Sequence, residues 1–392
     1  MAPDNAQRSF LQSKFQLFPS RFRSWSSAEC QTAVGGRNGM TWPASSLPWP
    51  TMFVPRARYQ IPWSDNVLIL APGEIPTVDF YLSTRLTTTT EKLLFRRDSR
   101  TTVEGMEDLP HGTFVIIVRH ASRAWLRALE RLKNRWSGVA YLMDDDIPGA
   151  WRCHDVPLDY GLWTTGRYLL AKNGLASICD RVWLSTVALG HRFSLLTSTL
   201  VEPLAFSPRR SGAASFGCRR WGYHGTRIHL RELRWLLPVV ETVQRSVPGA
   251  VFEVFGNHRV EEMFSHLTDI TVIRPRPWPE YVRHCHNGDL AVGLAPLLSG
   301  PFNAVRSHTK VFDINRCGAV GLYSNRQPYA DALAGSGAVL LPDDHQAWAA
   351  ETIRLLLDDE RRLTKYQQMS VWLASRPTNG KLENLIAESN PS

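Results

Sequence analysis

The chain has 392 residues, of which 43% are hydrophobic and 21% are charged, as in an ordinary globular protein with room for two domains. It contains no run of eighteen or more apolar residues, so the sequence predicts no membrane-spanning helix. The net charge of +9 fits either a solvated basic surface or attraction to anionic ligands or an anionic membrane. Nucleic acid would also be attracted, but no nucleic-acid-binding module is recognisable, so we expect no such partner.

Residues 1–62 differ from the rest of the chain, because they are rich in Ser, Pro, Arg and Trp and nearly devoid of acids. Their lack of periodicity predicts a basic, disordered N-terminal extension. Two alternatives stay open: a basic amphipathic arm over residues 10–25 that touches a membrane, or a start codon assigned upstream of the true one at Met40 or Met52. No continuous apolar core precedes a cleavage site, so we expect a cytoplasmic protein, with at most a peripheral contact at the inner face of the membrane.

From Asn66 onward, strand-like and helix-like patterns alternate, which predicts a parallel α/β sheet in a first domain over residues 63–206. The segment 114–118 is continuously apolar, as in a strand buried on both faces. The apolar residues of the helix predicted after it recur with helical spacing, at Trp125, Leu129, Leu132 and Trp136. The strands predicted in this half are 67–70, 114–118, 139–143, 181–185 and 201–204.

Residues 207–220 are rich in Ser, Gly and Arg and are predicted to link two domains. The second domain is predicted over residues 221–375, with strands at 251–255 and 270–273, and a C-terminal tail over residues 376–392. The six cysteines are scattered, without a CxxC pair or metal-ligand spacing. We therefore expect reduced, buried thiols and no metal site.

Three adjacent carboxylates, Asp144, Asp145 and Asp146, directly follow the predicted strand 139–143. Ligands of parallel α/β sheets bind at the carboxyl ends of strands, where Arg119 is also expected. Adjacent carboxylates repel one another, so such a cluster needs a compensating role. One interpretation is that a carboxylate deprotonates or binds a hydroxyl acceptor. The alternatives are Mg²⁺ binding and a solvated acidic turn that caps the next helix.

The most informative segment is residues 301–324, in which polar and cationic side chains follow a predicted strand. Asn303, Arg306 and Lys310 precede or open a predicted helix that carries Asp313. Cations near a helix start suit phosphate, because free backbone N–H groups and the helix dipole favour anions there. Arg306 and Lys310 are expected to share a helix face and to neutralise a diphosphate in place of a metal, the alternative being a solvated basic face. The Asp313 carboxylate can accept hydrogen bonds from sugar hydroxyls, so the segment fits a nucleotide-sugar site.

Residues His224, Gly225 and Thr226 are predicted to close a strand and open a helix. Gly225 would let a ligand approach the backbone, and Thr226 would cap a helix whose N-terminus could hold a pyrophosphate. A strand-to-helix turn without a ligand is the alternative. His284 and His286 form a His-x-His pair, but no third ligand is near in sequence. Both are therefore expected on the surface of a helix.

Residues 301–324 resemble the donor-site segment of GT-B glycosyltransferases, particularly the bacterial family 1/4-like group, and the resemblance extends over residues 66–375. In that family a helix ends in Glu-Ala-x-Ala-x-Gly-x-Pro-Val, and its acidic residue holds the ribose. Here Asp-Ile-Asn-Arg-Cys-Gly-Ala-Val occupies this place, which implies that Asp313 holds the ribose. The chain departs from the family pattern at three positions. Asp313 stands where the family has Glu, Val320 stands where it has Pro, and Val305 stands where it has the first Glu of its paired-glutamate motif.

The resemblance implies the GT-B fold, in which two Rossmann-like domains face each other across a cleft, the N-terminal one for the acceptor and the C-terminal one for the donor. It implies transfer of a hexosyl group from a nucleoside-diphosphate sugar to a hydroxyl of a glycan, lipid-linked or small-molecule acceptor, as in bacterial polysaccharide biosynthesis. No metal or other cofactor is expected, and Mg²⁺ would enter only if the Asp cluster bound it. The alternatives are a GT-B-like nucleotide-sugar epimerase, a metal-dependent GT-A-like transferase, and a non-catalytic sugar-binding or scaffold relative, which Val305 and Val320 favour.

Overall fold

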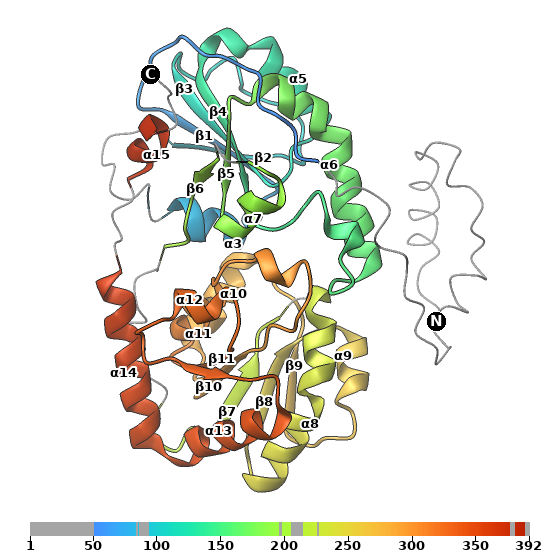
Figure 1. Cartoon of the computed structure of the whole chain (residues 1–392), viewed down its shortest axis with the longest axis vertical. Helices are drawn as coiled ribbons and strands as arrows, with labels where there is room; N and C mark the ends of the chain where they lie inside the picture. The colour runs from blue at the N-terminus through green and yellow to red at the C-terminus, as the bar shows by residue number, and fades with distance from the viewer. Residues whose placement is uncertain are drawn as a thin grey trace, which may run out of the picture. The chain divides into compact units, whose positions relative to one another are not determined.

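The computed structural model describes residues 51–83, 85, 94–195, 198–204, 215–225, 227–376 and 381–388. These residues belong to one unit, Trp49–Ser392, and residues 1–50 of the predicted extension lie outside the described part of the chain. The described part contains two six-stranded sheets, and every strand pairing in it is parallel (Figure 1). The predicted α/β class is therefore confirmed.

The first sheet has the strand order β2-β1-β3-β4-β5-β6. Its strands are β1 (Val67–Ala71), β2 (Leu94–Asp98), β3 (Thr113–Val118), β4 (Trp136–Met143), β5 (Arg181–Leu184) and β6 (Thr199–Leu200). All residues of β3 are buried, as expected of a central parallel strand. The predicted strand at 201–204 is wrong, because the pairing of β5 with β6 ends at Leu200. Pro203 also lacks the N–H group that a longer ladder would need.

The helices of the first domain are α3 (Pro76–Val78), α5 (Arg123–Arg131), α6 (Leu158–Ile178) and α7 (Val187–Arg192). The side chain of Ser122 caps α5 by accepting a hydrogen bond from the Trp125 N–H. The predicted helical stripe runs too far, because α5 ends before Trp136, which is the first residue of β4. Trp136 still packs beside α5, since its indole N–H donates to the Leu129 carbonyl at 3.0 Å.

Residues 51–62 belong to the first domain, so the prediction that the extension runs to residue 62 is wrong for this part. Met52 and Phe53 are buried in the core of that domain. The Phe53 N–H donates a hydrogen bond to the Tyr168 hydroxyl at 2.8 Å. These contacts tie the segment to α6.

The second sheet has the strand order β12-β11-β10-β7-β8-β9. Its strands are β7 (Arg220–Tyr223), β8 (Val251–Phe255), β9 (Ile270–Ile273), β10 (Val292–Ala295), β11 (Val320–Ser324) and β12 (Val339–Leu341). Read from β9, this is the strand order of the Rossmann fold. The winding reverses between β7 and β10, and ligands of such sheets bind beyond the carboxyl ends of the strands at this switch point.

Seven helices in the described part of the chain accompany the second sheet: α8 (Leu230–Ser246), α9 (His258–Met263), α10 (Trp278–Asn287), α11 (Lys310–Arg316), α12 (Tyr329–Ala332), α13 (His345–Leu357) and α14 (Asp359–Ser375). A core formed by α8, α13 and the strands lies on one face of the sheet. None of the described helices combines the length and the apolarity needed to cross a bilayer.

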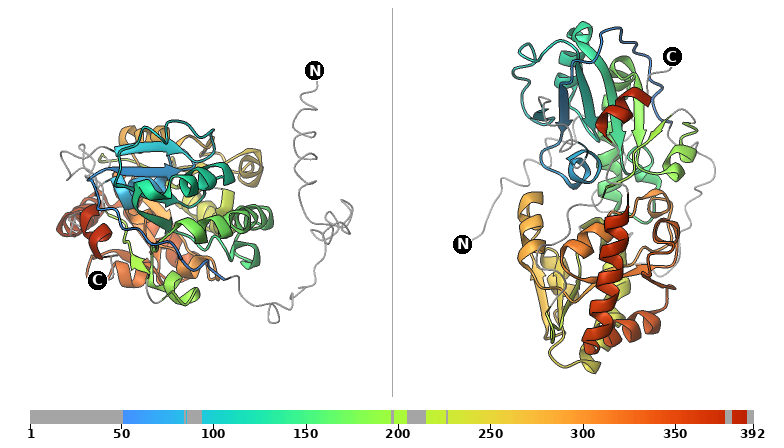
Figure 2. Two further views of the ribbon diagram at one scale, coloured as in Figure 1. Left: turned by 90° about the horizontal axis from the view of Figure 1, so that it is seen from above. Right: turned by 90° about the vertical axis from the view of Figure 1, so that its left-hand side faces the viewer.

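The chain returns to the first domain at its end. Helix α15 (Leu382–Glu388) lies beside the strands of the first sheet in all three views (Figures 1 and 2). Its buried residues, Leu382, Leu385 and Ile386, join a core cluster with residues of β1 and β3. The Arg181 guanidinium also donates to the Ile386 carbonyl at 2.9 Å. The predicted C-terminal tail over 376–392 therefore includes a packed helix.

We predict that Ile386→Ala lowers the free energy of unfolding by about 2–4 kcal/mol, because it opens a cavity between α15 and the first sheet. Asn384→Ala is the matched control, since Asn384 lies on the exposed side of the same helix. Urea denaturation of both variants measures the difference. Equal stabilities of the two variants would show that α15 does not pack as described.

Candidate functional site

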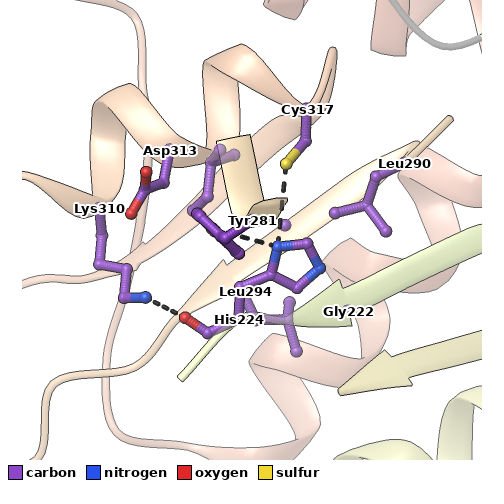
Figure 3. A pocket seen from close by; sticks show the side chains of 10 residues that line it. Gly222, His224, Tyr281, Leu290, Leu294, Lys310, Asp313 and Cys317 are labelled. Carbon is purple, nitrogen blue, oxygen red and sulfur yellow. Dashed lines mark hydrogen bonds between the residues drawn. The ribbon is translucent and has the colours of Figure 1, made fainter. Parts of the chain in front are cut away.

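A small cavity lies beside the ends of β7 and β10, at the switch point of the second sheet (Figure 3). The two strands are neighbours, with Trp221 paired to Val292, so the residues that follow them converge there. The cavity is lined by Gly222, His224, Tyr281, Leu290, Gly293, Leu294, Lys310, Asp313, Ile314 and Cys317. Three residues predicted to bind a donor, His224, Lys310 and Asp313, are thus brought together.

Lys310 supplies a positive charge to this cavity. It is the first residue of α11, and its ammonium group donates a hydrogen bond to the His224 carbonyl oxygen (Figure 3). The Lys310 Nζ atom also lies 5.9 Å from the centre of the Tyr223 ring, a cation–π distance. Burial lowers the pKa of Lys310. An anionic ligand would therefore stabilise its charged form.

Asp313 lies on the same helix and lines the same cavity (Figure 3). Burial raises the pKa of Asp313 to about 6, although Lys310 and Arg316 favour its ionised form. The Arg316 Nη1 atom is 3.5 Å from Asp313 Oδ1. At neutral pH the Asp313 carboxylate is thus mainly ionised and can accept hydrogen bonds from hydroxyl groups.

Arg306 bridges the two sheets and does not lie on α11. Its backbone is extended, with φ −73° and ψ 160°, so the prediction that Arg306 and Lys310 share a helix face is wrong. Arg306 Nε is 3.3 Å from Asp145 Oδ1, and its Nη1 is 3.1 Å from His229 Nε2. Burial, together with the Arg306 charge, holds the pKa of His229 well below its ordinary value. The neutral His229 ring can therefore accept a hydrogen bond from Arg306.

Residues 302–307 form a bridging loop between the two domains. Val305 is buried in the core of the first domain, and its carbonyl oxygen accepts a hydrogen bond from Thr186 Oγ1 at 2.7 Å. The Ser307 hydroxyl lies 2.5 Å from the Tyr81 hydroxyl. Val305 stands at the position that the sequence resemblance aligns with the first Glu of the paired-glutamate motif, and it makes an apolar contact with the other domain.

Asn303 holds the bridging loop in place. Its buried side chain donates hydrogen bonds to Glu232 Oε1 at 2.8 Å and to the Leu298 carbonyl at 2.9 Å. Its backbone N–H donates to Asp155 Oδ2 at 2.8 Å. These contacts fix the loop that carries Arg306, whereas a direct contact of Asn303 with a donor stays a prediction.

Asp144 and Asp145 follow β4 and are compensated by arginines. Arg119, which follows β3, lies 3.2 Å from Asp144 Oδ1 and 3.1 Å from Asp145 Oδ2. Thr77 Oγ1 donates to Asp144 Oδ2 at 2.7 Å. Burial raises the pKa of Asp144, and Arg119 opposes the shift. Because Arg119 and Arg306 already balance these carboxylates, a magnesium ion is not needed to explain the cluster.

Asp146 differs from its two neighbours, because its side chain is completely buried. It lies 2.7 Å from Arg192 Nη1 and accepts a hydrogen bond from the Gly149 N–H at 2.7 Å. A substrate would have to unpack the turn after β4 to reach it. We therefore assign Asp146 a structural role and leave it out of the proposed site.

Gly225 packs against the ring of Tyr223. A Cβ atom at Gly225 would lie 2.5 Å from Tyr223 Cε1, which by itself requires glycine at this position. The predicted approach of a donor to Gly225 stays a prediction. Thr226, the predicted helix cap, lies outside the described residues. The described chain resumes with a short 3₁₀ helix, Arg227–His229, and α8 begins at Leu230.

His284 lies on α10 as predicted but is not a surface residue. It is half-buried, and its Nε2 lies 2.8 Å from Glu253 Oε1, whereas His286 is exposed. The same Glu253 oxygen lies 3.0 Å from His224 Nε2. Sequence reasoning missed Glu253, because it lies in β8 and no local spacing connects it with either histidine.

The sequence matches no protein-family model and none of the curated proteins. Its likeness is to solved structures. The N-terminal domain of trehalose-6-phosphate phosphatase from Candida albicans aligns with 87% of this chain and 99% of its own, with a TM-score of 0.51 and 10% identity. The structure of TarM aligns with 72% of this chain and 55% of its own, with a TM-score of 0.50 and 8% identity.

The chain has the GT-B fold. The predicted architecture of two Rossmann-like domains is therefore confirmed. At identities this low the likeness shows the fold alone, and one fold serves many activities.

We predict that Asp146→Ala lowers the free energy of unfolding by about 3 kcal/mol, because it leaves the Arg192 charge without its buried partner. The double variant Asp146→Ala/Arg192→Met should be more stable than the sum of the two single losses predicts. Chemical denaturation of the three variants measures this coupling. Strictly additive losses would show that the pair makes no net contribution.

Proposed function

We propose that the protein transfers a sugar from a nucleoside-diphosphate sugar to a hydroxyl acceptor. The GT-B fold is compatible with this reaction class. The observation that carries the proposal is the place of Lys310, a half-buried ammonium group at the switch point of the second sheet with the Asp313 carboxylate in the same cavity. Nucleotide ligands of such sheets bind at this point.

The cavity offers the two kinds of contact that a nucleotide needs. The Lys310 ammonium, which bonds to the His224 carbonyl, has further hydrogens that it can donate to phosphate oxygens. The Asp313 carboxylate can accept hydrogen bonds from ribose hydroxyls, in the role that the family resemblance implies. Lys310, at the start of α11, would thus hold the diphosphate, and Asp313, three residues further along the helix, would hold the ribose.

Arg306 would supply the second positive charge to the leaving diphosphate. Its guanidinium group contacts Asp145 through Nε and His229 through Nη1. A guanidinium group has five N–H groups, so these two contacts leave others that can donate to a phosphate. Arg306 and Lys310 would neutralise charge that a metal ion neutralises in other transferases. Each such donor contributes about 3 kcal/mol to transition-state stabilisation in a dry site. We therefore propose a reaction without a metal at the diphosphate.

Asp144 or Asp145 would bind or deprotonate the acceptor hydroxyl. The acceptor oxygen would attack the anomeric carbon, and the bond from that carbon to the phosphate oxygen would break, so that the nucleoside diphosphate leaves. The hydroxyl proton would pass to the carboxylate. The raised pKa of Asp144 suits this task, because a base works best with a pKa closer to the working pH.

For the acceptor we propose a glycan or a lipid-linked hydroxyl compound, as in bacterial polysaccharide biosynthesis at the cytoplasmic face of a membrane. The net charge of +9 supports attraction to anionic donors and to anionic lipid. Residues 10–25, the candidate membrane arm, lie outside the described residues.

A non-catalytic sugar-binding protein is the second candidate, and the burial of Val305 favours it. In the related family a carboxylate at this position is expected near the donor sugar, whereas Val305 packs into the core of the first domain. Such a protein would bind a nucleotide-sugar and leave it unchanged. Donor consumption in the presence of acceptors separates the two candidates.

We predict that Lys310→Met weakens binding of a nucleoside diphosphate about 10- to 100-fold, because a charge-assisted hydrogen bond is lost. The same substitution should not lower the melting temperature of the ligand-free protein, since burial disfavours the charged lysine. Calorimetric titration and thermal shift with UDP, GDP, ADP and TDP measure both effects.

Lys133→Met is the matched control for this experiment, because Lys133 is an exposed lysine of the first domain. It should bind the nucleotide as the wild type does. The donor site is placed wrongly if Lys310→Met binds the nucleotide with unchanged affinity. The proposed function itself fails if the wild type binds none of the four nucleotides.

We predict that Asp145→Asn reduces sugar transfer about 100-fold or more while nucleotide affinity stays equal or rises. Affinity should not fall, because Asp145 competes with the diphosphate for Arg306. Asp144→Asn, assayed in parallel, shows whether the second carboxylate also serves the acceptor. Full activity in both variants would exclude the carboxylates from the reaction.

A chelator added to the wild-type enzyme tests the scheme without a metal at the diphosphate. Loss of activity that magnesium restores and zinc does not restore would exclude this scheme.

A further inference from the structure

A group of metal-ligating side chains, which the proposed reaction does not use, lies at the edge of the same cavity. His224 directly follows β7, Cys285 lies in α10, and Cys317 is the C-cap residue directly after α11. One ligand atom from each residue lies within 4.8 Å of the other two. The Cys317 Sγ atom is 3.8 Å from His224 Nδ1. Figure 3 draws this contact as a dashed line. Both cysteine side chains are buried.

Glu253 determines which nitrogen of His224 faces the thiols. Glu253 Oε1 lies 3.0 Å from His224 Nε2 and 2.8 Å from His284 Nε2, and its other oxygen pairs with Arg220. An ionised carboxylate only accepts hydrogen bonds, so the His224 Nε2 atom carries a hydrogen. In the neutral ring the lone pair then lies on Nδ1, the nitrogen that faces Cys317. A carboxylate bonded to the far nitrogen is the usual partner of a metal-bound histidine.

The spacing and the chemistry of these ligands suit zinc. Zinc–sulfur bonds of about 2.3 Å and zinc–nitrogen bonds of about 2.0 Å place the two ligand atoms about 3.5 Å apart around a tetrahedral ion. The Cys317 and His224 atoms are 3.8 Å apart. Thiolate and imidazole ligands favour zinc, whereas magnesium and calcium favour oxygen.

We propose that His224, Cys285 and Cys317 bind a zinc ion, with Glu253 orienting the histidine. Three protein ligands leave one tetrahedral position for water or another small ligand. The ion would join β7, α10 and α11, and α11 carries two of the proposed donor residues. Zinc would thus hold α11 at the switch point. The site requires no nucleotide, so it stands independently of the proposed function, and it replaces the expectation of no metal that followed from cysteine spacing.

A second set of ligands competes with this one. His224, Glu253 and His284 also offer atoms within 4.8 Å of one another. Glu253 is already engaged by Arg220 and by both histidines, so a metal there would have to displace these contacts. We therefore place the ion on the thiol side of His224. A disulfide between Cys285 and Cys317 is the other competing state.

The metal content of the full chain tests the proposal. The protein is dialysed against zinc with a reductant, freed of loosely bound metal by gel filtration, and analysed by elemental mass spectrometry. We expect one zinc per chain in the wild type and in the control Cys218→Ser, and a loss of tenfold or more in Cys285→Ser and Cys317→Ser. Cys218 is a suitable control because its thiol donates to the Asp289 carbonyl, away from the cluster.

X-ray absorption of the zinc-loaded wild type tests the ligands without any variant, in case a serine variant does not fold. We expect two sulfur neighbours at about 2.3 Å and nitrogen or oxygen neighbours at about 2.0 Å. A zinc shell of nitrogen and oxygen alone would assign the metal to the Glu253 set and overturn the proposal. No zinc in the reduced wild type, or a Cys285–Cys317 disulfide that persists under reductant, would also overturn it.

Discussion

Charge balance at the carboxyl edge of the first sheet is the constraint on which the rest of the site depends. Three adjacent carboxylates follow β4, and such a cluster is unfavourable unless cations compensate it. The compensating guanidinium groups are those of Arg119, Arg192 and Arg306. Two of them belong to the first domain, but Arg306 comes from the bridging loop of the second. The edge of the first sheet is therefore fully balanced only when the bridging loop reaches it.

The same constraint connects the proposed donor site with the proposed acceptor site. A diphosphate that takes Arg306 from Asp145 would free the Oδ1 atom of Asp145 at the moment when the donor is in place, while Arg119 stays beside Oδ2. The base for the acceptor would then become available only with the donor bound, which limits hydrolysis of the donor by water. Val305 and the Tyr81–Ser307 contact hold the bridging loop close enough for this exchange. The proposed zinc ion would bind Cys317 after the last residue of α11, whereas Lys310 is the first residue of this helix. The ion would thus keep α11 fixed while Arg306 moves.

Local patterns were sufficient to predict much of the fold. A continuously apolar segment such as β3 predicts a strand buried on both faces. The alternation of strand patterns with helix patterns predicts parallel sheets. The predictions failed where the outcome depends on distant parts of the chain. Helical periodicity continued into Trp136 because a buried strand residue is as apolar as a buried helix residue. Arg306 was predicted on the same helix face as Lys310, but α11 begins only at Lys310, later than the pattern indicates. Helix α15 was not predicted, because it packs against a sheet that is far away in sequence.

A crystal structure of the wild-type protein with a bound nucleoside diphosphate would show whether Lys310, Arg306 and Asp313 form the donor site. We expect diphosphate oxygens within hydrogen-bonding distance of Lys310 Nζ and of the Arg306 guanidinium group, a ribose hydroxyl on Asp313, and a broken Arg306–Asp145 ion pair. A nucleotide bound elsewhere, with Arg306 still on Asp145 and Lys310 still on the His224 carbonyl, would contradict this assignment.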